Sequence, residues 1–128
     1  MQQVLAEVRS VLVVDDYPEN AEMLAELVAS YGHRVRIAGD GAEALALLAA
    51  EPASLVFLDV GLPDMDGYEV AAAIRARLGA GCQIVALTGF DGQEERAAAL
   101  RAGCDAFLVK PFKPLEIERL LAAPGGPR

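Results

Sequence analysis

Short apolar runs recur along the chain and alternate with longer stretches in which apolar residues follow a helical spacing. The runs at 11–14, 55–59, 84–87 and 106–109 are nearly continuous, whereas the run at 34–38 alternates polar and apolar residues. Continuous runs of this length predict strands that are buried on both faces. The alternating run predicts a strand at the edge of a sheet, with one wetter face.

A stretch with helical spacing follows each predicted strand. The predicted helices span residues 18–31, 41–51, 67–78, 93–102 and 114–122. Five strands alternating with five helices predict an α/β fold, with a doubly wound five-stranded parallel sheet and helices on both faces. Short right-handed crossovers favour the flavodoxin-like order 2-1-3-4-5, in which the first and third strands are neighbours.

The spacing also predicts which face of each helix packs against the sheet. The expected buried positions are Met23, Leu24, Leu27, Val28 and Tyr31 in the first helix and Ala42, Leu45, Ala46 and Ala49 in the second.

Length and composition fit one folded domain. The chain has 128 residues, of which 54% are hydrophobic and 23% charged, and this balance excludes a disordered chain. We expect a lead-in at residues 1–9, a domain at 10–122 and a flexible tail at 123–128. Cys82 and Cys104 form no CxxC pair, so we expect buried thiols. His33 follows a glycine in a turn, without Cys or His nearby, and we expect no zinc or catalytic role for it.

The charge and the apolar runs limit the partners and the location of the protein. The formal net charge is -8 and no basic stripe is present, so we expect no direct contact with nucleic acid or an anionic membrane. No apolar run approaches the roughly 20 residues that a membrane-spanning helix needs. The first ten residues lack the basic and apolar regions of a secretory signal. A cytoplasmic location is therefore the expectation.

Polar side chains stand where four of the predicted strands end. Asp15 and Asp16 follow the first strand, Asp59 ends the third, Thr88 follows the fourth and Lys110 follows the fifth. The carboxyl ends of parallel strands share one edge of the sheet, which is where ligands bind in such folds. Three carboxylates crowded together repel one another unless a cation is present. Oxygen donors without Cys or His favour a hard cation, with Mg²⁺ first and Mn²⁺ as a substitute.

This set of residues predicts phosphoryl transfer. A carboxylate such as Asp59 can act as a nucleophile toward phosphorus. In such a transfer the protein mainly positions groups and neutralises charge, and Mg²⁺, Lys110 and Thr88 could divide the phosphoryl oxygens among them.

In their order along the chain, these motifs resemble the receiver domain of two-component response regulators. The match rests on Asp15-Asp16, Asp59, Thr88-Gly89 and Lys110-Pro111-Phe112, each after an apolar run, and covers residues 10–122. The resemblance implies that Asp59 is the phosphoacceptor and that Lys110 contacts the phosphoryl group. It also implies that Asp16, Asp59 and the backbone carbonyl of Gly61 bind Mg²⁺ directly, with Asp15 acting mainly through water. The Lys110-Pro111 bond is expected to be cis, as in the family.

The resemblance further implies a switch and a set of partners. Thr88 and Phe107 match the family's switch pair, in which the hydroxyl moves toward the phosphoryl group and the aromatic ring turns inward. Phe107 stands where a tyrosine is often found. The expected phosphodonor is a histidine kinase or a histidine phosphotransfer protein. The face formed by residues 93–102, 106–109 and 114–122 is expected to carry the response and could form a homodimer.

Other functions fit the sequence less well. A phosphatase of the haloacid dehalogenase type needs a second aspartate two residues after its nucleophile, and position 61 is Gly. Neither GxxxxGK(S/T) nor GxGxxG follows a strand, which argues against nucleotide binding. The sequence therefore predicts a signalling phosphoacceptor that assists its own phosphorylation and dephosphorylation, and not an enzyme with a separate product. The alternative is an interaction module that keeps the receiver fold but acts without phosphorylation.

Overall fold

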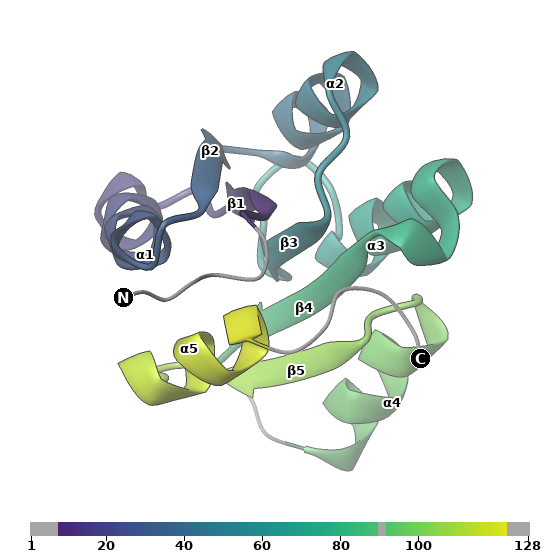
Figure 1. The fold of residues 1–128 in the computed structure, drawn as a ribbon. Coiled ribbons are helices and arrows are strands. Elements are labelled where there is room, and N and C mark those ends of the chain that lie inside the picture. The colour runs from purple at the N-terminus through teal and green to yellow at the C-terminus, as the bar shows by residue number, and fades with distance from the viewer. Residues whose placement is uncertain (1–7, 90–91, 123–128) are drawn as a thin grey trace.

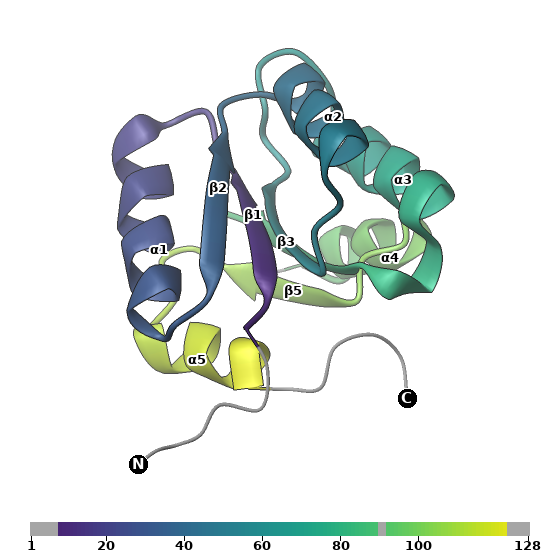
Figure 2. The same ribbon diagram turned by 45° about the horizontal axis from the view of Figure 1, so that its top comes forward.

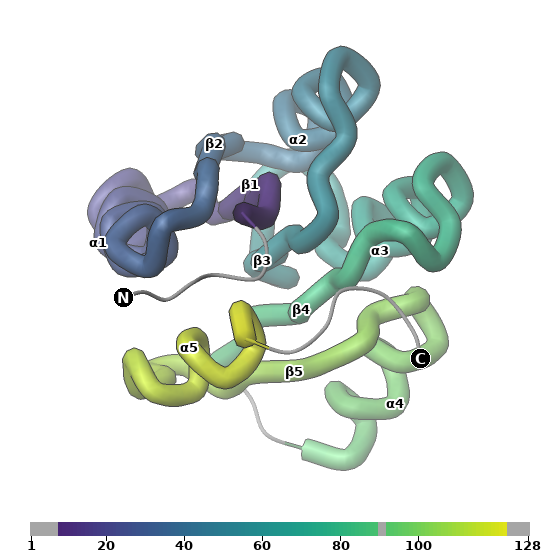
Figure 3. Tube along the Cα trace, in the orientation of Figure 1, coloured from purple at the N-terminus to yellow at the C-terminus, as the bar shows by residue number. Residues whose placement is uncertain are grey.

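The strands of the protein form one parallel sheet in the order β2-β1-β3-β4-β5 (Figure 1). The structure is a computed structural model and describes residues 8–89 and 92–122. The five strands are β1 (Ser10–Val14), β2 (Arg34–Ala38), β3 (Leu55–Asp59), β4 (Gln83–Thr88) and β5 (Ala106–Val109). The trace in Figure 3 shows how the chain returns to place β1 between β2 and β3. The predicted fold class and strand order are confirmed.

Helices cover both faces of the sheet. They are α1 (Pro18–Ser30), α2 (Gly41–Ala50), α3 (Gly67–Leu78), α4 (Gln93–Arg101) and α5 (Pro114–Ala122), with a short 3₁₀ turn at Gly79–Gly81 after α3. Helices α1 and α5 lie on one face, and α2, α3 and α4 lie on the other (Figures 1 and 2).

Successive residues of the central strands belong to different halves of the core. In β3, Leu55 and Phe57 pack with α1 and α5, whereas Val56 and Leu58 pack with α2 and α3. All four side chains are fully buried. A parallel sheet with helices on both faces has no wet side, so its central strands carry apolar residues at every position. This explains the continuous apolar runs of the sequence.

The predicted faces of α1 and α2 were correct for the leucines, for Val28 and for Tyr31, which are buried or half-buried, and wrong for Met23 and the alanines. Leu24 and Val28 of α1 are buried, but Met23 is 64% exposed. In α2 the buried positions include Ala44 and Leu48, and the predicted face is wrong because Ala42, Ala46 and Ala49 are exposed. Alanine is favourable anywhere on a helix, so its spacing says little about which face is buried.

The two cysteines are buried, and the histidine accepts a hydrogen bond from the backbone. Cys82 and Cys104 are buried free thiols, as predicted, and burial raises the pKa of each to about 11, so both stay protonated at neutral pH. The Nδ1 atom of His33 accepts a hydrogen bond from the backbone N–H of Arg9 at 3.0 Å. In the part of the chain that the structure describes, every helix is too short or too polar to cross a membrane.

Candidate functional site

The strand register brings the predicted acidic residues together. Strands β1 and β3 are neighbours, with Val14 opposite Leu58, so the residues that follow, Asp15 and Asp59, leave the core side by side. Asp15, Asp16 and Asp59 each offer a carboxylate oxygen, and these oxygens lie within 4.8 Å of one another. We call this end of the sheet, where the strands finish, the carboxyl edge.

Local turns orient two of the three carboxylates. Asp15 is buried, and its Oδ1 accepts a hydrogen bond from the backbone N–H of Tyr17 at 3.0 Å. Asp59 is half-buried, and its Oδ1 accepts a hydrogen bond from the backbone N–H of Gly61 at 2.9 Å. Asp16 is exposed. Each turn therefore fixes one carboxylate oxygen and leaves the second facing the cluster.

Lys110 spans the two inner acids. Its Nζ lies 3.2 Å from Oδ2 of Asp59 and 3.3 Å from Oδ2 of Asp15. Burial by itself lowers the pKa of Lys110, but the charges of Asp59 and Asp15 outweigh it and the pKa is raised. Burial raises the pKa of Asp15, helped by the charge of Asp59 and opposed by the Tyr17 amide and by Lys110. The site therefore favours the charged form of Lys110 and disfavours the charged form of Asp15.

The end of β4 and the segment after β5 place Lys110. Thr88 is the last residue of β4 and is buried, and its carbonyl accepts a hydrogen bond from the backbone N–H of Lys110 at 2.7 Å. The Lys110-Pro111 peptide bond is cis, the isomer that the family resemblance implies. Thr88 thus adjoins the acid cluster at the same carboxyl edge.

Phe107 lies farther into the sheet, on β5. It is half-buried against the core beneath α2, α3 and α4. The guanidinium carbon of Arg96, on α4, lies 5.0 Å from the centroid of the Phe107 ring, which is within the range of a cation–π contact. Sequence reasoning missed Arg96, because nothing in its local spacing shows that α4 packs across β5.

The donor set fits a hard divalent cation. Its oxygens come from three carboxylates, and one ammonium offsets only one of three negative charges when all the acids are ionised. Clustered carboxylates of this kind are the ligands that Mg²⁺ and Mn²⁺ prefer. The Gly61 amide binds Asp59, so the backbone at Gly61 also adjoins the site.

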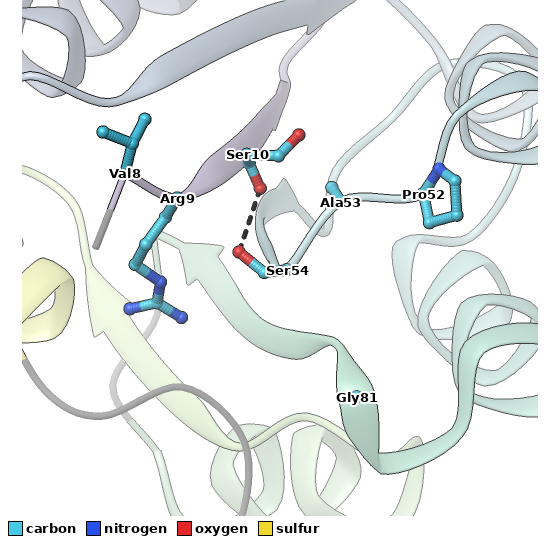
Figure 4. A pocket seen from close by; sticks show the side chains of 7 residues that line it. All are labelled: Val8, Arg9, Ser10, Pro52, Ala53, Ser54 and Gly81. Atoms are coloured by element: carbon cyan, nitrogen blue, oxygen red, sulfur yellow. Dashed lines mark hydrogen bonds between the residues drawn. The ribbon is translucent and has the colours of Figure 1, made fainter. Parts of the chain in front are cut away.

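A second concavity lies at the opposite end of the sheet, the amino edge, where the strands begin (Figure 4). Its volume is about 420 Å³. It is lined by Val8, Arg9, Ser10, Pro52, Ala53, Ser54 and Gly81. The guanidinium of Arg9 donates hydrogen bonds to the carbonyls of Leu120 and Leu121 and to the side chain of Gln83. The charged group of this pocket thus serves to close the C-terminal end of α5, and the carboxyl edge remains the candidate site.

The structure thus combines a parallel five-stranded sheet with three acids and a lysine at its carboxyl edge. The family model described as "Response regulator receiver domain" matches residues 11–122. The chain belongs to the response regulator receiver domain family.

Known proteins that resemble the chain differ in length. The chain is 39% identical over 120 residues to the "Uncharacterized 14.6 kDa protein in sodA1 3'region" of Leptolyngbya boryana, covering 93% of this chain and 91% of that protein. It is 37% identical over 112 residues to the sensor histidine kinase RcsC of Salmonella typhi, covering 88% of this chain but 12% of the kinase. A receiver domain protein (CheY-like) from Methanospirillum hungatei JF-1 matches with a TM-score of 0.83 and 29% identity, covering 90% of this chain and 91% of that one.

Proposed function

We propose that this receiver domain accepts a phosphoryl group on Asp59 from a phosphohistidine of a histidine kinase or a histidine phosphotransfer protein. The observation that carries the proposal is the convergence of Asp15, Asp16, Asp59 and Lys110 at the carboxyl edge. The similarity to a sensor histidine kinase supports a partner of that kind. The folded unit is residues 10–122, with 1–9 as a lead-in and 123–128 as a tail, most of which lie outside the described residues.

In the transfer step, a carboxylate oxygen of Asp59 forms a bond to phosphorus while the bond from phosphorus to the donor histidine nitrogen breaks. The Gly61 amide holds the other carboxylate oxygen and so orients the nucleophile. Asp16, Asp59 and the Gly61 backbone carbonyl would bind Mg²⁺, with Asp15 acting through water, and the ion would supply charge neutralisation for the phosphoryl oxygens.

Lys110 and Thr88 complete the site. The raised pKa keeps Lys110 protonated, and its Nζ is already in contact with the nucleophile. Phosphorylation converts the carboxylate into an acyl phosphate whose oxygens carry the charge, so the ammonium can move from Asp59 to a phosphoryl oxygen. The Thr88 hydroxyl, at the end of the adjacent strand, would bond a second oxygen. The same residues would assist hydrolysis of the acyl phosphate, and no separate product is made.

The response is carried by the face formed by α4, β5 and α5. Thr88 moving toward the phosphoryl group would make room for Phe107 to turn inward, which couples the site to α4. Leu100 on α4 and Leu115 on α5 are 68% and 53% exposed, which suits a face that meets a partner or a second copy of the chain. We expect action in the cytoplasm, without direct contact to nucleic acid or membrane.

Phosphorylation with acetyl phosphate tests the proposal. In the presence of Mg²⁺, mass spectrometry should detect the gain of one phosphoryl group on the wild type and none on Asp59→Asn. Asp66→Asn is the matched control, because Asp66 lies in the same connection but caps α3 through the Tyr68 amide, and it should be labelled like the wild type. Equal labelling of the wild type and Asp59→Asn would overturn the assignment. No labelling of the wild type, with no Mg²⁺ binding, would favour the phosphorylation-independent module.

A further inference from the structure

Helix α4 is attached to the domain by little apolar burial. Of its nine residues, all of which the structure describes, Ala99 alone is buried, whereas α1 and α3 each bury four. The Ncap residue Gly92 offers no side-chain cap. Contacts made by the polar side chains of α4 therefore have a larger influence on its position than such contacts have on the other helices.

Two side chains of the first turns of α4 reach out in different directions. The carboxylate of Glu95 accepts a hydrogen bond of 2.6 Å from the Tyr68 hydroxyl, on α3. The neighbouring Arg96 places its guanidinium over the Phe107 ring, on β5. Tyr68 and Phe107 are both half-buried against the same part of the core. The start of α4 is thus held to α3 on one side and to the switch aromatic on the other.

Tyr68 is itself fixed relative to the phosphoacceptor. The preceding residue, Gly67, donates a backbone hydrogen bond to the Val60 carbonyl at 3.2 Å. A Cβ at Gly67 would lie 2.3 Å from the Cα of Val60, the residue after Asp59, so the two backbones are in direct contact. This contact couples the start of α3 to the end of β3, so Tyr68 gives Glu95 an anchor whose position follows that of β3.

We propose that the Tyr68–Glu95 hydrogen bond, together with Arg96 over Phe107, holds α4 in its unphosphorylated position and so sets how much activator the switch requires. This inference rests on the proposed function, because it concerns the regulation of the same site. Inward rotation of Phe107 would remove its ring from beneath Arg96, and the departing α4 would draw Glu95 away from Tyr68. Both contacts therefore favour the unswitched state, and loss of either raises the population of the switched one.

Titration with beryllofluoride, a phosphoryl mimic, in the presence of Mg²⁺ tests the inference. Backbone amide NMR signals of α4 and β5 report the switched fraction. Tyr68→Phe keeps the ring and removes the hydroxyl, so the half-saturating concentration should fall about three- to tenfold, as expected when one hydrogen bond to a charged group favours the inactive state. Glu95→Gln keeps an acceptor oxygen and removes the charge, so it should shift the half-saturating concentration in the same direction by less. Adding Glu95→Gln to Tyr68→Phe should change little, because the hydroxyl that binds this side chain is then absent.

The chain supplies a matched control. The Tyr31 hydroxyl donates a hydrogen bond to Glu118 at 3.3 Å, which joins the end of α1 to α5 and does not touch α4. Tyr31→Phe should titrate like the wild type, and thermal unfolding should show that all variants remain folded. A wild-type curve for both Tyr68→Phe and Glu95→Gln, or a shift to higher concentration, would overturn the proposed role of the Tyr68–Glu95 hydrogen bond and leave the assignment of the phosphoacceptor intact. A wild type that gives no response to beryllofluoride would instead overturn the proposed function.

Discussion

The two edges of the sheet gather different charged side chains and use them in different ways. At the carboxyl edge, Asp15, Asp16 and Asp59 offer carboxylate oxygens that lie within 4.8 Å of one another, and the ammonium of Lys110 contacts Asp15 and Asp59. At the amino edge, Arg9 and Arg75 each donate several hydrogen bonds to backbone carbonyls. The carboxyl edge gathers acids beside Lys110, whereas the arginines of the amino edge close the ends of helices.

The direction of the helices explains this division. In a parallel α/β fold every helix begins at the carboxyl edge and ends at the amino edge, so free N–H groups face one edge and free carbonyls the other. Arginine matches the carbonyl-rich edge: Arg36 donates to Leu47 and Glu51 at the end of α2, and Arg9 donates to the end of α5. The N–H-rich edge suits an incoming phosphoryl group. The arginine contacts that close helix ends therefore lie at one edge, and the acid cluster lies at the other.

The largest effect on stability is expected from Arg75→Ala. The guanidinium donates to the carbonyls of Gly79, Cys82 and Gly103 and pairs with Asp105 at 2.7 Å, joining the segments before β4 and β5. Its removal leaves partly buried carbonyls without donors, which should lower the free energy of unfolding by about 2–4 kcal/mol in urea denaturation. Binding of Mg²⁺ by the folded fraction should not change.

Arg34→Ala provides the control for that experiment. Arg34 pairs with Glu51 at the same distance of 2.7 Å and at the same edge, but both side chains are about half exposed or more. Its loss should cost no more than about 0.5 kcal/mol, because solvent screens an exposed pair. Equal losses for Arg34 and Arg75 would show that the carbonyl contacts of Arg75 add nothing to its ion pair.

At the carboxyl edge, by contrast, replacing Asp15 by a neutral residue is expected to raise the stability of the fold. The folded state raises the pKa of Asp15 above its unfolded value, chiefly through burial. The contribution of this group is therefore most favourable below the unfolded pKa of about 3.9 and is lost as pH rises through the raised folded pKa. At neutral pH without divalent cations, Asp15→Asn should stabilise the domain, on the order of 1 kcal/mol, by removing one charge from the cluster.

Addition of Mg²⁺ should make the wild type more stable than Asp15→Asn. A ligand that binds the folded state alone raises stability with its concentration, so saturating Mg²⁺ should stabilise the wild type more than Asp15→Asn. Thermal unfolding at several Mg²⁺ concentrations measures both effects. A variant that is less stable than the wild type in the presence of a chelator would show that the acids do not strain the apo fold.

The acids and the sheet were predictable from the sequence, and the arginine contacts were not. Continuous apolar runs mark buried parallel strands, and parallel strands must bring their ends to one edge, so Asp15 and Asp59 could be placed together without coordinates. Arg75 instead binds carbonyls up to 28 residues away, and no side-chain pattern marks a carbonyl. The Tyr68–Glu95 contact depends likewise on how α3 packs beside α4, which the helical spacing does not specify.

A smaller effect than at Arg75 is expected at Asp64, an acid at the carboxyl edge whose neighbours are backbone amides. Asp64 lies between β3 and α3, yet its carboxylate accepts hydrogen bonds from the Gly41 and Ala42 amides at the start of α2, at 2.9 and 3.0 Å. The Gly41 bond is the main reason why the pKa of Asp64 is lowered. Its contribution to stability is therefore complete above the unfolded pKa of about 3.9 and is lost as pH falls through the lowered folded pKa.

Asp64→Asn should lower the midpoint of thermal unfolding by a few degrees at most at neutral pH, because the asparagine keeps one acceptor oxygen and loses the charge that the helix N-terminus favours. The difference from the wild type should shrink as pH falls below about 4 and vanish in stronger acid. Opposite signs for Asp15→Asn and Asp64→Asn would mean that an acid at this edge costs stability only where another carboxylate, and not a row of amides, is its neighbour. The same sign for both would assign the cost to the position of the acid and not to its partners.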